Sequence, residues 1–278
     1  MSPAARQSAS SRKSGPTGTG WQDYGRADGA PVQRRELRYG SWEFRTASDL
    51  ARSWRNSSPA PALLGSVARQ PSMLRVLAAI WRLPVTDLRV QHADADAWWF
   101  RNWFHARRRL AWAVLDLPPG EDHYLVGRPR QALRTNLSHA RALGVTSSRV
   151  TYETWFEAAS AVLRARGDEP GAQQDRPGPG QQAAYYVARD ALGTPLAFAG
   201  AALFGHFAAL FALVSRPDRQ PDASWARYQL HTFLALDLGS SGVEHLLTGS
   251  ALREPPGTQY FQHLLGYRAR NLRIRVDR

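Results

Sequence analysis

Two almost wholly apolar stretches limit the fold of this chain more than any other feature of its sequence. They run from Leu196 to Phe204 and from Phe207 to Ser215, and only a Gly-His pair separates them. Two strand-like stretches joined by two residues predict a tight antiparallel hairpin. Tyr185–Arg189, followed by a glycine-containing turn, adds a third strand and completes a meander. Because both faces of the last two strands must be covered, we expect a sheet that lies between helices.

Helical and strand-like patterns flank this meander on both sides. In Arg130–Leu143, apolar residues recur every three or four positions, and Gly144 follows as a C-terminal stop signal. In chain order, the patterns predict helices over 130–143 and 150–166, the meander, a helix over 223–236, a strand over 242–247, a helix over 258–265 and a strand over 268–276. This mixture of helices and strands predicts the α/β fold class.

The first 120 residues divide into two parts by composition. Residues 1–35 are rich in Ser, Gly, Ala and Arg and too poor in apolar residues to form a core, so we expect a disordered basic tail. Residues 36–120 are expected to form an N-terminal subdomain, with strands over 83–90 and 111–117. Within it, the Trp- and Arg-rich segment 98–110 fits three interpretations: a surface that stacks on nucleic-acid bases, an interfacial membrane helix, or a helix with its aromatic face in the core.

Charge is a second constraint on function. The chain has 36 Lys and Arg against 23 Asp and Glu, a formal net charge of +13, and Lys13 is its single lysine. Such an excess favours an anionic partner: nucleic acid, a phosphorylated cofactor or acidic lipid. GC-rich coding is an alternative explanation for the preference for Arg over Lys, but it does not account for the excess of basic over acidic residues.

Absent features exclude several classes of site. Cysteine is missing, which excludes disulfides, thiolate metal sites and cysteine nucleophiles. The eight histidines have no metal-ligand spacing, so we expect no metal. No run of about 18 apolar residues is present, and Met1–Gly20 has no apolar signal region, so we expect a cytoplasmic protein without a transmembrane segment.

Two segments carry a resemblance to a known family. Arg128–Val145 (RPRQALRTNLSHARALGV) resembles the Arg-rich helix, ending in Gly-Val, that opens the acyltransferase half of Fem-type proteins. Tyr260–Arg268 (YFQHLLGYR) is similar to the aromatic-to-glycine ending of the last helix in the GNAT superfamily of N-acyltransferases. The resemblance implies a GNAT-like mixed, mainly antiparallel sheet flanked by helices, with an acyltransferase domain over 121–278. Residues 36–120 would then be a reduced first GNAT half.

The same resemblance implies a reaction and a donor. An acyl or aminoacyl group would pass from acyl-CoA or aminoacyl-tRNA to an amine acceptor, with no permanently bound cofactor. GNAT proteins that use coenzyme A usually have a glycine-rich loop before the helix that follows the meander, whereas residues 216–227 contain no glycine. Possible anion contacts there are Arg216, Arg219, Ser224 and Arg227. The missing loop weakens the expectation of acetyl-CoA and leaves room for tRNA.

Other site residues are candidates with structural alternatives. The catalytic candidates are Glu244, expected among apolar neighbours on a strand, Tyr260 as a leaving-group acid, and His231 as a base or a buried core histidine. The substrate-binding candidates are Arg130, Arg134 and Asn136, which also fit a solvated helix face. Gln262 occupies the position, four residues before Gly266, where many GNAT enzymes have a catalytic tyrosine.

Two alternative functions stay open at this point. One is a protein that has lost catalysis and uses a GNAT scaffold to bind nucleic acid or another polyanion. The other is a peripheral membrane protein that binds through the segment 98–110. The missing glycine loop favours the first of these over an enzyme, and the order of helices and strands favours neither.

Overall fold

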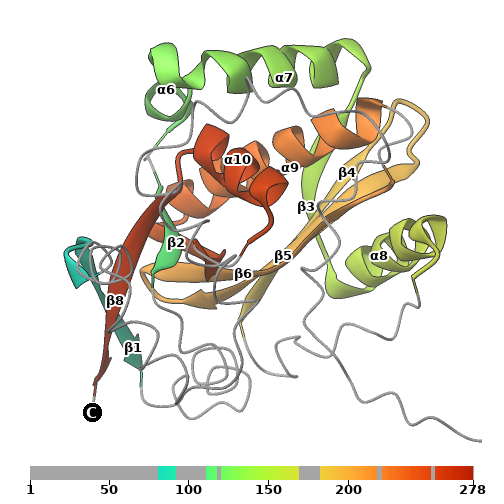
Figure 1. Ribbon diagram of the computed structural model, residues 1–278. Helices are drawn as coiled ribbons and strands as arrows, with labels where there is room; N and C mark the ends of the chain where they lie inside the picture. Colours follow the sequence, from blue (N-terminus) through green and yellow to red (C-terminus); the bar gives the residue numbers. More distant parts are fainter. Residues whose placement is uncertain are drawn as a thin grey trace, which may run out of the picture.

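The computed structural model describes residues 81–91, 111–117, 120–168, 182–217, 221–251 and 254–277 (Figure 1). The strands are β1 (Val85–Gln91), β2 (Trp112–Asp116), β3 (Thr146–Val150), β4 (Ala183–Arg189), β5 (Pro195–Phe204), β6 (Phe207–Ser215), β7 (His245–Ser250) and β8 (Arg268–Asp277). The helices are α6 (Glu121–Tyr124), the 3-10 turn η2 (Arg128–Arg130), α7 (Gln131–Ala142), α8 (Tyr152–Arg166), α9 (Pro221–Ser240) and α10 (Pro256–Leu265).

One eight-stranded sheet organises the described residues, in the order β1-β8-β2-β7-β6-β5-β4-β3. Five of its neighbouring pairs are antiparallel, while β1 with β8 and β6 with β7 are parallel. The meander of β4, β5 and β6 forms as its two short turns predict. This is the mixed, mainly antiparallel sheet that the sequence predicted.

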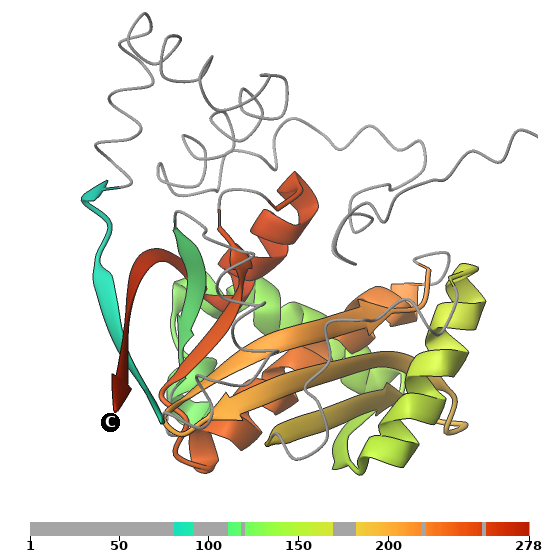
Figure 2. The same cartoon turned by 90° about the horizontal axis from the view of Figure 1, so that it is seen from below.

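Helices cover the two faces of the sheet unequally. α9 packs on β4, β5 and β6, and α7 and α10 lie on the same side, whereas α8 packs on the other side (Figures 1 and 2). Nearly every residue of β5 and β6 is buried, because each strand has a helix layer on one or both faces. The apolar face of α7, formed by Leu133, Leu137 and Ala140, belongs to the core shared with α9 and α10.

β6 and β7 share only a short parallel pairing. Their register joins Phe207–Ala209 to His245–Leu247. Beyond that point β6 continues along β5 while β7 continues along β2, and Figure 2 shows the two strands moving apart from their shared end. In the described residues, the pairing of β6 with β7 is thus confined to Phe207–Ala209, and from Leu210 onward β6 pairs with β5.

Several elements differ from the sequence-based expectations, including the starts of α8 at Tyr152 and of α10 at Pro256. β3 was not predicted, because its residues TSSRV are polar and mostly exposed, and pairing with β4 alone defines it as a strand. α9 is longer than expected, and β7 begins at His245 rather than at Gly242. Gly242 has a φ of +87°, a left-handed conformation that suits glycine in the turn after a helix.

Two strands come from the segment expected to form an N-terminal subdomain. β1 and β2 correspond to the strands predicted over 83–90 and 111–117, and both belong to the same sheet as the C-terminal elements. The tail 1–35 and the aromatic segment 98–110 lie outside the described residues, and the domain boundary near residue 120 stays a prediction. Of the helices that are described, none has the length and apolar character needed to cross a membrane.

Candidate functional site

Buried polar side chains gather where β6 and β7 separate. Thr248 follows directly after the last β7 residue that pairs with β6, and it is 3% exposed. Gln262 of α10 is equally buried and donates a hydrogen bond through Nε2 to Thr248 Oγ1 at 3.0 Å. Buried polar side chains are uncommon in an apolar core, so this hydrogen-bonded pair beside the point where β6 and β7 separate marks the candidate site. Ser215 is also buried, at 2% exposure, but lies at the far end of β6, six residues beyond the last residue that pairs with β7.

The amide of Gln262 is only half satisfied. Its Oε1 atom is buried and has no hydrogen-bond partner in the described chain. An unpaired buried polar atom costs about 1–3 kcal/mol, so the position favours a bound group or a water that completes the pair. The alternative amide orientation leaves Nε2 unpaired instead, so the conclusion does not depend on which end is oxygen.

A β-bulge lies beside the same opening. Between Gly200 and Ala201 of β5 the register skips Phe211 of β6, which is the extra residue of the bulge. The Phe211 ring lies directly over Gly200, where a Cβ atom would overlap it, and it also contacts Trp155 and Tyr185. Glycine at position 200 therefore permits the bulge, and the bulge redirects the backbone of β6 at the point where β7 leaves it.

Arginines and the first turn of α9 surround the outer end of the opening. Arg216 follows β6, and Arg227 of α9 lies over the Phe261 ring with its guanidinium carbon 4.7 Å from the ring centroid. In both arginines Nε is buried and has no partner in the described chain. Ser224 is half-buried in the first turn of α9, and Arg219 lies outside the described residues. Three of the four predicted anion contacts thus lie between the end of β6 and the first two turns of α9.

His231 is a core residue. It is 0% exposed, its Nε2 lies 2.7 Å from Tyr267 Oη, and its ring packs against Phe261. Burial, with a smaller effect from the Arg130 charge, lowers the pKa of His231 to about 3. The imidazole is therefore neutral at physiological pH, and the structure favours the core interpretation over that of a base.

The other two catalytic candidates are exposed. Tyr260 is 41% exposed on the outer side of α10. Glu244 is exposed just before β7, where its backbone bonds to His206 and Leu117. That position is the paired end of β7, away from the opening, so the apolar surroundings expected for Glu244 are wrong. The expectation failed because β7 begins three residues later than predicted, which leaves Glu244 outside the strand.

Arg130 links α7 to the end of α10. Its Nη1 atom donates to Leu264 O at 2.7 Å, and its guanidinium lies 5.2 Å from the Tyr124 ring centroid. Burial lowers the pKa of the Arg130 guanidinium from its usual value. Because the guanidinium fills the space above Gly266, where no Cβ would fit, Arg130 acts here as a helix C-terminal cap.

The two remaining substrate-binding candidates lie on α7. Arg134 donates through Nη1 to Leu125 O at 2.6 Å and to Gly127 O at 2.9 Å, and its side chain is exposed. Asn136 is half-buried. Neither residue is brought to the Gln262–Thr248 pair by any contact that the structure records, so the structure does not join the predicted substrate and donor residues into one site.

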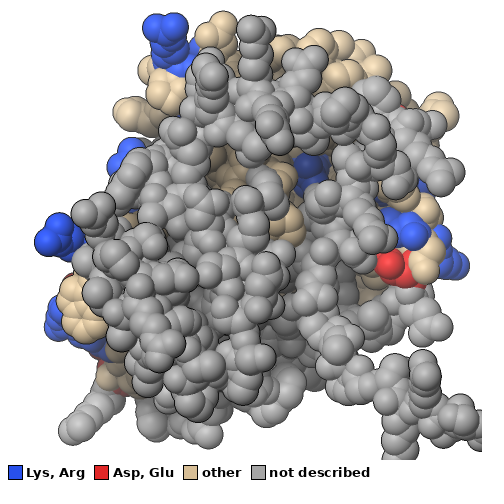
Figure 3. All heavy atoms as spheres, viewed as in Figure 1, with Lys and Arg blue, Asp and Glu red and all other residues tan. Residues whose placement is uncertain are grey.

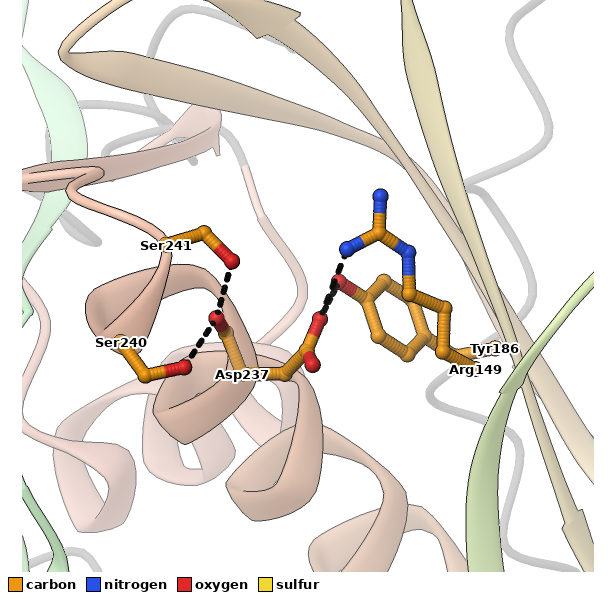
Figure 4. Close-up of polar contacts among 5 residues, drawn as sticks. All are labelled: Arg149, Tyr186, Asp237, Ser240 and Ser241. Carbon is orange, nitrogen blue, oxygen red and sulfur yellow. Dashed lines mark hydrogen bonds and ion pairs between the residues drawn. The ribbon is translucent and has the colours of Figure 1, made fainter.

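A separate polar cluster holds the C-terminal end of α9 to the sheet edge (Figure 4). Asp237 Oδ2 accepts hydrogen bonds from Tyr186 Oη at 2.8 Å and from Arg149 Nη1 at 3.3 Å. The hydroxyls of Ser240 and Ser241 both donate to the Asp237 carbonyl at 2.8 Å. The cluster satisfies the last turn of the helix and explains why α9 ends there.

A second ion-pair cluster lies at the paired end of β7. Asp116 Oδ1 is 3.1 Å from His245 Nδ1, and Asp116 also pairs with Arg270 of β8. Arg270 Nη1 in turn donates to Thr86 Oγ1 of β1. These contacts cross four strands and join the β1 edge to the rest of the sheet. In the described residues, no group of three or more His, Asp or Glu side chains is arranged to hold a metal ion.

Sequence reasoning missed the buried polar residues of β6 and β7. Thr248 and Ser215 each follow an apolar stretch, where a small hydroxyl residue gives no signal of function. Glu254, 6% exposed in the loop between β7 and α10, was also missed. Buried carboxylates are rare, and its position after the strand that borders the opening is the signal that could have found it. Gln262 was identified only as the residue standing where a tyrosine was expected.

Comparison with known proteins finds a likeness in fold only. No protein-family model and no curated protein sequence matches the chain. The solved structures that match include the DUF2156 C-terminal domain of a protein described as a lysylphosphatidylglycerol synthetase from Agrobacterium fabrum, with 17% identity, a TM-score of 0.41 and 58% coverage of each chain. L-PGS from Bacillus licheniformis has 14% identity and a TM-score of 0.42, over 58% of this chain and 57% of its own.

GCN5-related N-acetyltransferases are among the matches as well. The one from Kribbella flavida has 16% identity and a TM-score of 0.33, over 58% of this chain and 55% of its own. The chain thus spans between half and two thirds of the length of each of these three proteins. At this level of likeness, function has to be argued from the chain's own residues.

Proposed function

We propose that this chain is an acyl- or aminoacyltransferase that moves the acyl group of an activated donor to an amine. The observation that carries the proposal is the opening between β6 and β7, where a bulged strand separates from its neighbour beside the buried Gln262–Thr248 pair, whose Gln262 Oε1 has no partner in the described chain. Such an opening offers side-chain hydrogen bonds to a carbonyl group in a place shielded from water.

The reaction needs three things from the site. The amine must attack as the neutral base, the carbonyl oxygen must be stabilised as it becomes an oxyanion, and the leaving group must depart. The amine nitrogen forms a bond to the carbonyl carbon, and collapse of the tetrahedral intermediate breaks the bond to the donor sulfur or oxygen. The proton released by the amine ends on the leaving group or in water. The Thr248 hydroxyl accepts from Gln262 Nε2 and can donate its own proton to the oxyanion, and the second Nε2 hydrogen of Gln262 is a further donor.

Glu254 is our candidate for the base that takes this proton. It is a buried carboxylate in the loop that joins β7 to the helix bearing Gln262. His231 does not fit that role, because its low pKa and its bond to Tyr267 hold it neutral within the core. Glu244 and Tyr260 do not fit it either, because both side chains are exposed.

The donor would lie with its phosphates towards the start of α9. Arg216, Arg227 and Ser224 lie near that end, and the N-terminus of a 20-residue helix adds the positive end of its dipole. Acyl-CoA and aminoacyl-tRNA both place a phosphorylated group at some distance from an activated carbonyl, so either donor suits this arrangement. The proposal places the chain in the Fem-type branch and includes aminoacyl-tRNA as one of its two candidate donors. The assay below identifies the amine.

Replacing Gln262 tests the proposal most simply. The full chain is incubated with acetyl-CoA, longer acyl-CoAs and charged tRNAs together with a panel of amines, and products are found by mass spectrometry. With a donor and amine identified, Gln262→Met is expected to lower kcat by about 100-fold or more, the usual cost of losing one oxyanion donor. Gln91→Met, an exposed glutamine on β1, is the matched control and should keep full activity.

The assay has two outcomes that would refute the proposal. One is that no donor transfers its acyl group to any amine while the protein is folded, as judged by circular dichroism. The other is that transfer occurs and Gln262→Met has the same kcat as Gln91→Met. In that second case the opening between β6 and β7 would not be the reaction site.

A further inference from the structure

The outward face of α7 is a basic surface. From His123 to Tyr152 the sequence has five arginines and no Asp or Glu. Two of these, Arg130 and Arg149, are used inside the protein, in the α10 cap and in the ion pair with Asp237. The other three are exposed: Arg128, Arg134 and Arg141. Figure 3 shows blue side-chain atoms at the upper left edge of the molecule, where α6 and the start of α7 lie in Figure 1.

These arginines follow one stripe of the helix surface. Arg134, Ser138 and Arg141 are spaced by four and three residues, and Gln131 and Arg128 continue the same spacing towards η2. The stripe is about 20 Å long at 1.5 Å per residue. Each member is exposed and carries hydrogen-bond donors. We call these five residues the α7 stripe.

The orientation of Arg134 is fixed in advance. Its Nη1 atom is held by the carbonyl oxygens of Leu125 and Gly127, and both contacts use the same terminal nitrogen. Nη2 and Nε are therefore left to point a rigid, charged edge outward. A guanidinium already held in place loses less entropy when it binds a phosphate than a freely moving side chain does.

The chemistry of the α7 stripe favours nucleic acid over a membrane as its partner. A helix that lies in a membrane interface needs an exposed apolar face. The apolar face of α7 is buried in the core, with Leu133 at 0% and Leu137 at 1% exposure. The exposed side of α7 carries arginine guanidinium groups and the uncharged hydrogen-bond donors of Gln131 and Ser138. These groups suit the phosphates along a nucleic-acid backbone.

We propose that the α7 stripe binds the phosphodiester backbone of a nucleic acid, largely without regard to sequence. Three of the five residues are arginines whose charge attracts phosphates of any sequence, so recognition would be mainly by charge. The proposal does not depend on the transferase reaction, because no recorded contact in the described residues joins the α7 stripe to the Gln262–Thr248 pair.

The test measures binding of fluorescent hairpins by anisotropy across a salt series, with the full chain and with one RNA and one DNA hairpin of equal length. The wild-type chain should bind, and log K should fall linearly with log salt. The triple variant Arg128→Gln, Arg134→Gln, Arg141→Gln should bind at least about tenfold more weakly at 50 mM salt, with the salt slope reduced by about 2–3. Comparing the RNA hairpin with the DNA hairpin shows which nucleic acid the α7 stripe prefers.

A second triple variant shows whether a loss of binding comes from the α7 stripe or from the lower net charge. Arg89→Gln, Arg273→Gln, Arg275→Gln removes three exposed arginines from β1 and β8, and this variant should bind like the wild type. Equal weakening in both triple variants would overturn the proposal, because net charge would then account for binding. Binding to vesicles containing anionic lipid, but to neither hairpin, would overturn it as well.

Thermal melts and a Gln262→Met variant complete the design. The melting temperature of each triple variant shows whether lost binding is due to lost folding, and Gln replacements keep a hydrogen-bond donor beside Leu125 and Gly127. Gln262→Met should bind hairpins like the wild type. A failed transferase assay with intact, stripe-dependent hairpin binding would refute only the proposed enzyme.

Discussion

Replacing Gly266 with alanine should destabilise the protein by about 2–4 kcal/mol, because two costs add. Gly266 has a φ of +89°, a left-handed conformation that costs an L-residue about 1–2 kcal/mol. The new Cβ would also overlap the Arg130 guanidinium and push it away from Leu264 O, leaving a helix-end carbonyl without its partner. Urea unfolding followed by circular dichroism measures the change in the free energy of unfolding.

A double-mutant cycle isolates the part that comes from Arg130. Arg130→Ala alone loses the hydrogen bond to Leu264 and the contact with Tyr124, but it empties the space above Gly266. In that background, Gly266→Ala should cost only the backbone strain, about 1–2 kcal/mol. An equal cost of Gly266→Ala with and without Arg130 would contradict the assignment of Arg130 as the cap of α10.

Acid should destabilise the protein through His231. The folded-state pKa of His231 is about 3, whereas the unfolded chain has the ordinary value near 6.5. Below pH 6.5 the unfolded state therefore binds a proton that the folded state does not, so stability falls as the pH is lowered towards 3. The loss is about 1.4 kcal/mol per pH unit once the unfolded histidine is fully protonated.

His231→Gln should remove this contribution. A glutamine can still hydrogen bond with Tyr267 Oη, so the variant keeps a partner for that buried hydroxyl. Between pH 7.5 and pH 5, wild-type stability should fall by about 2 kcal/mol more than that of His231→Gln, because other groups titrate equally in both. His123→Gln, at an exposed histidine of α6, is the control and should keep the wild-type pH dependence. Parallel curves for the wild type and His231→Gln would contradict the burial of a neutral histidine.

Elements with a strong local pattern were predicted well from the sequence. α7 and α10 have apolar periodicity and end near glycines with positive φ, Gly144 and Gly266, while β5 and β6 are almost wholly apolar. β3 has no such pattern, because its strand conformation comes from pairing with β4. The start of β7 was misplaced because backbone bonds from Glu244 and His245 to the His206 carbonyl define it, and that partner is far away in the sequence.

The candidate site was harder to predict than the fold. Arg216 and Arg227 were identified because charge at the start of a helix is a local signal, and the structure places them near the end of β6 and the start of α9. The Gln262–Thr248 pair depends on the separation of β6 from β7, which no local pattern encodes. The capping contact of Arg130 was not predicted for the same reason, because its partners Leu264 and Gly266 are more than 130 residues away.

Hydrogen–deuterium exchange tests the central claim, that the opening between β6 and β7 holds the activated donor. Exchange of the full chain is measured with and without a saturating donor, using acyl-CoA in one arm and aminoacyl-tRNA in another. Amides of 210–216, in β6 and just after it, and of the first turn of α9 should exchange more slowly with the donor that the enzyme uses, because bound groups occupy or shield them. Unchanged exchange in both segments, with a donor that binds or turns over, would contradict the account.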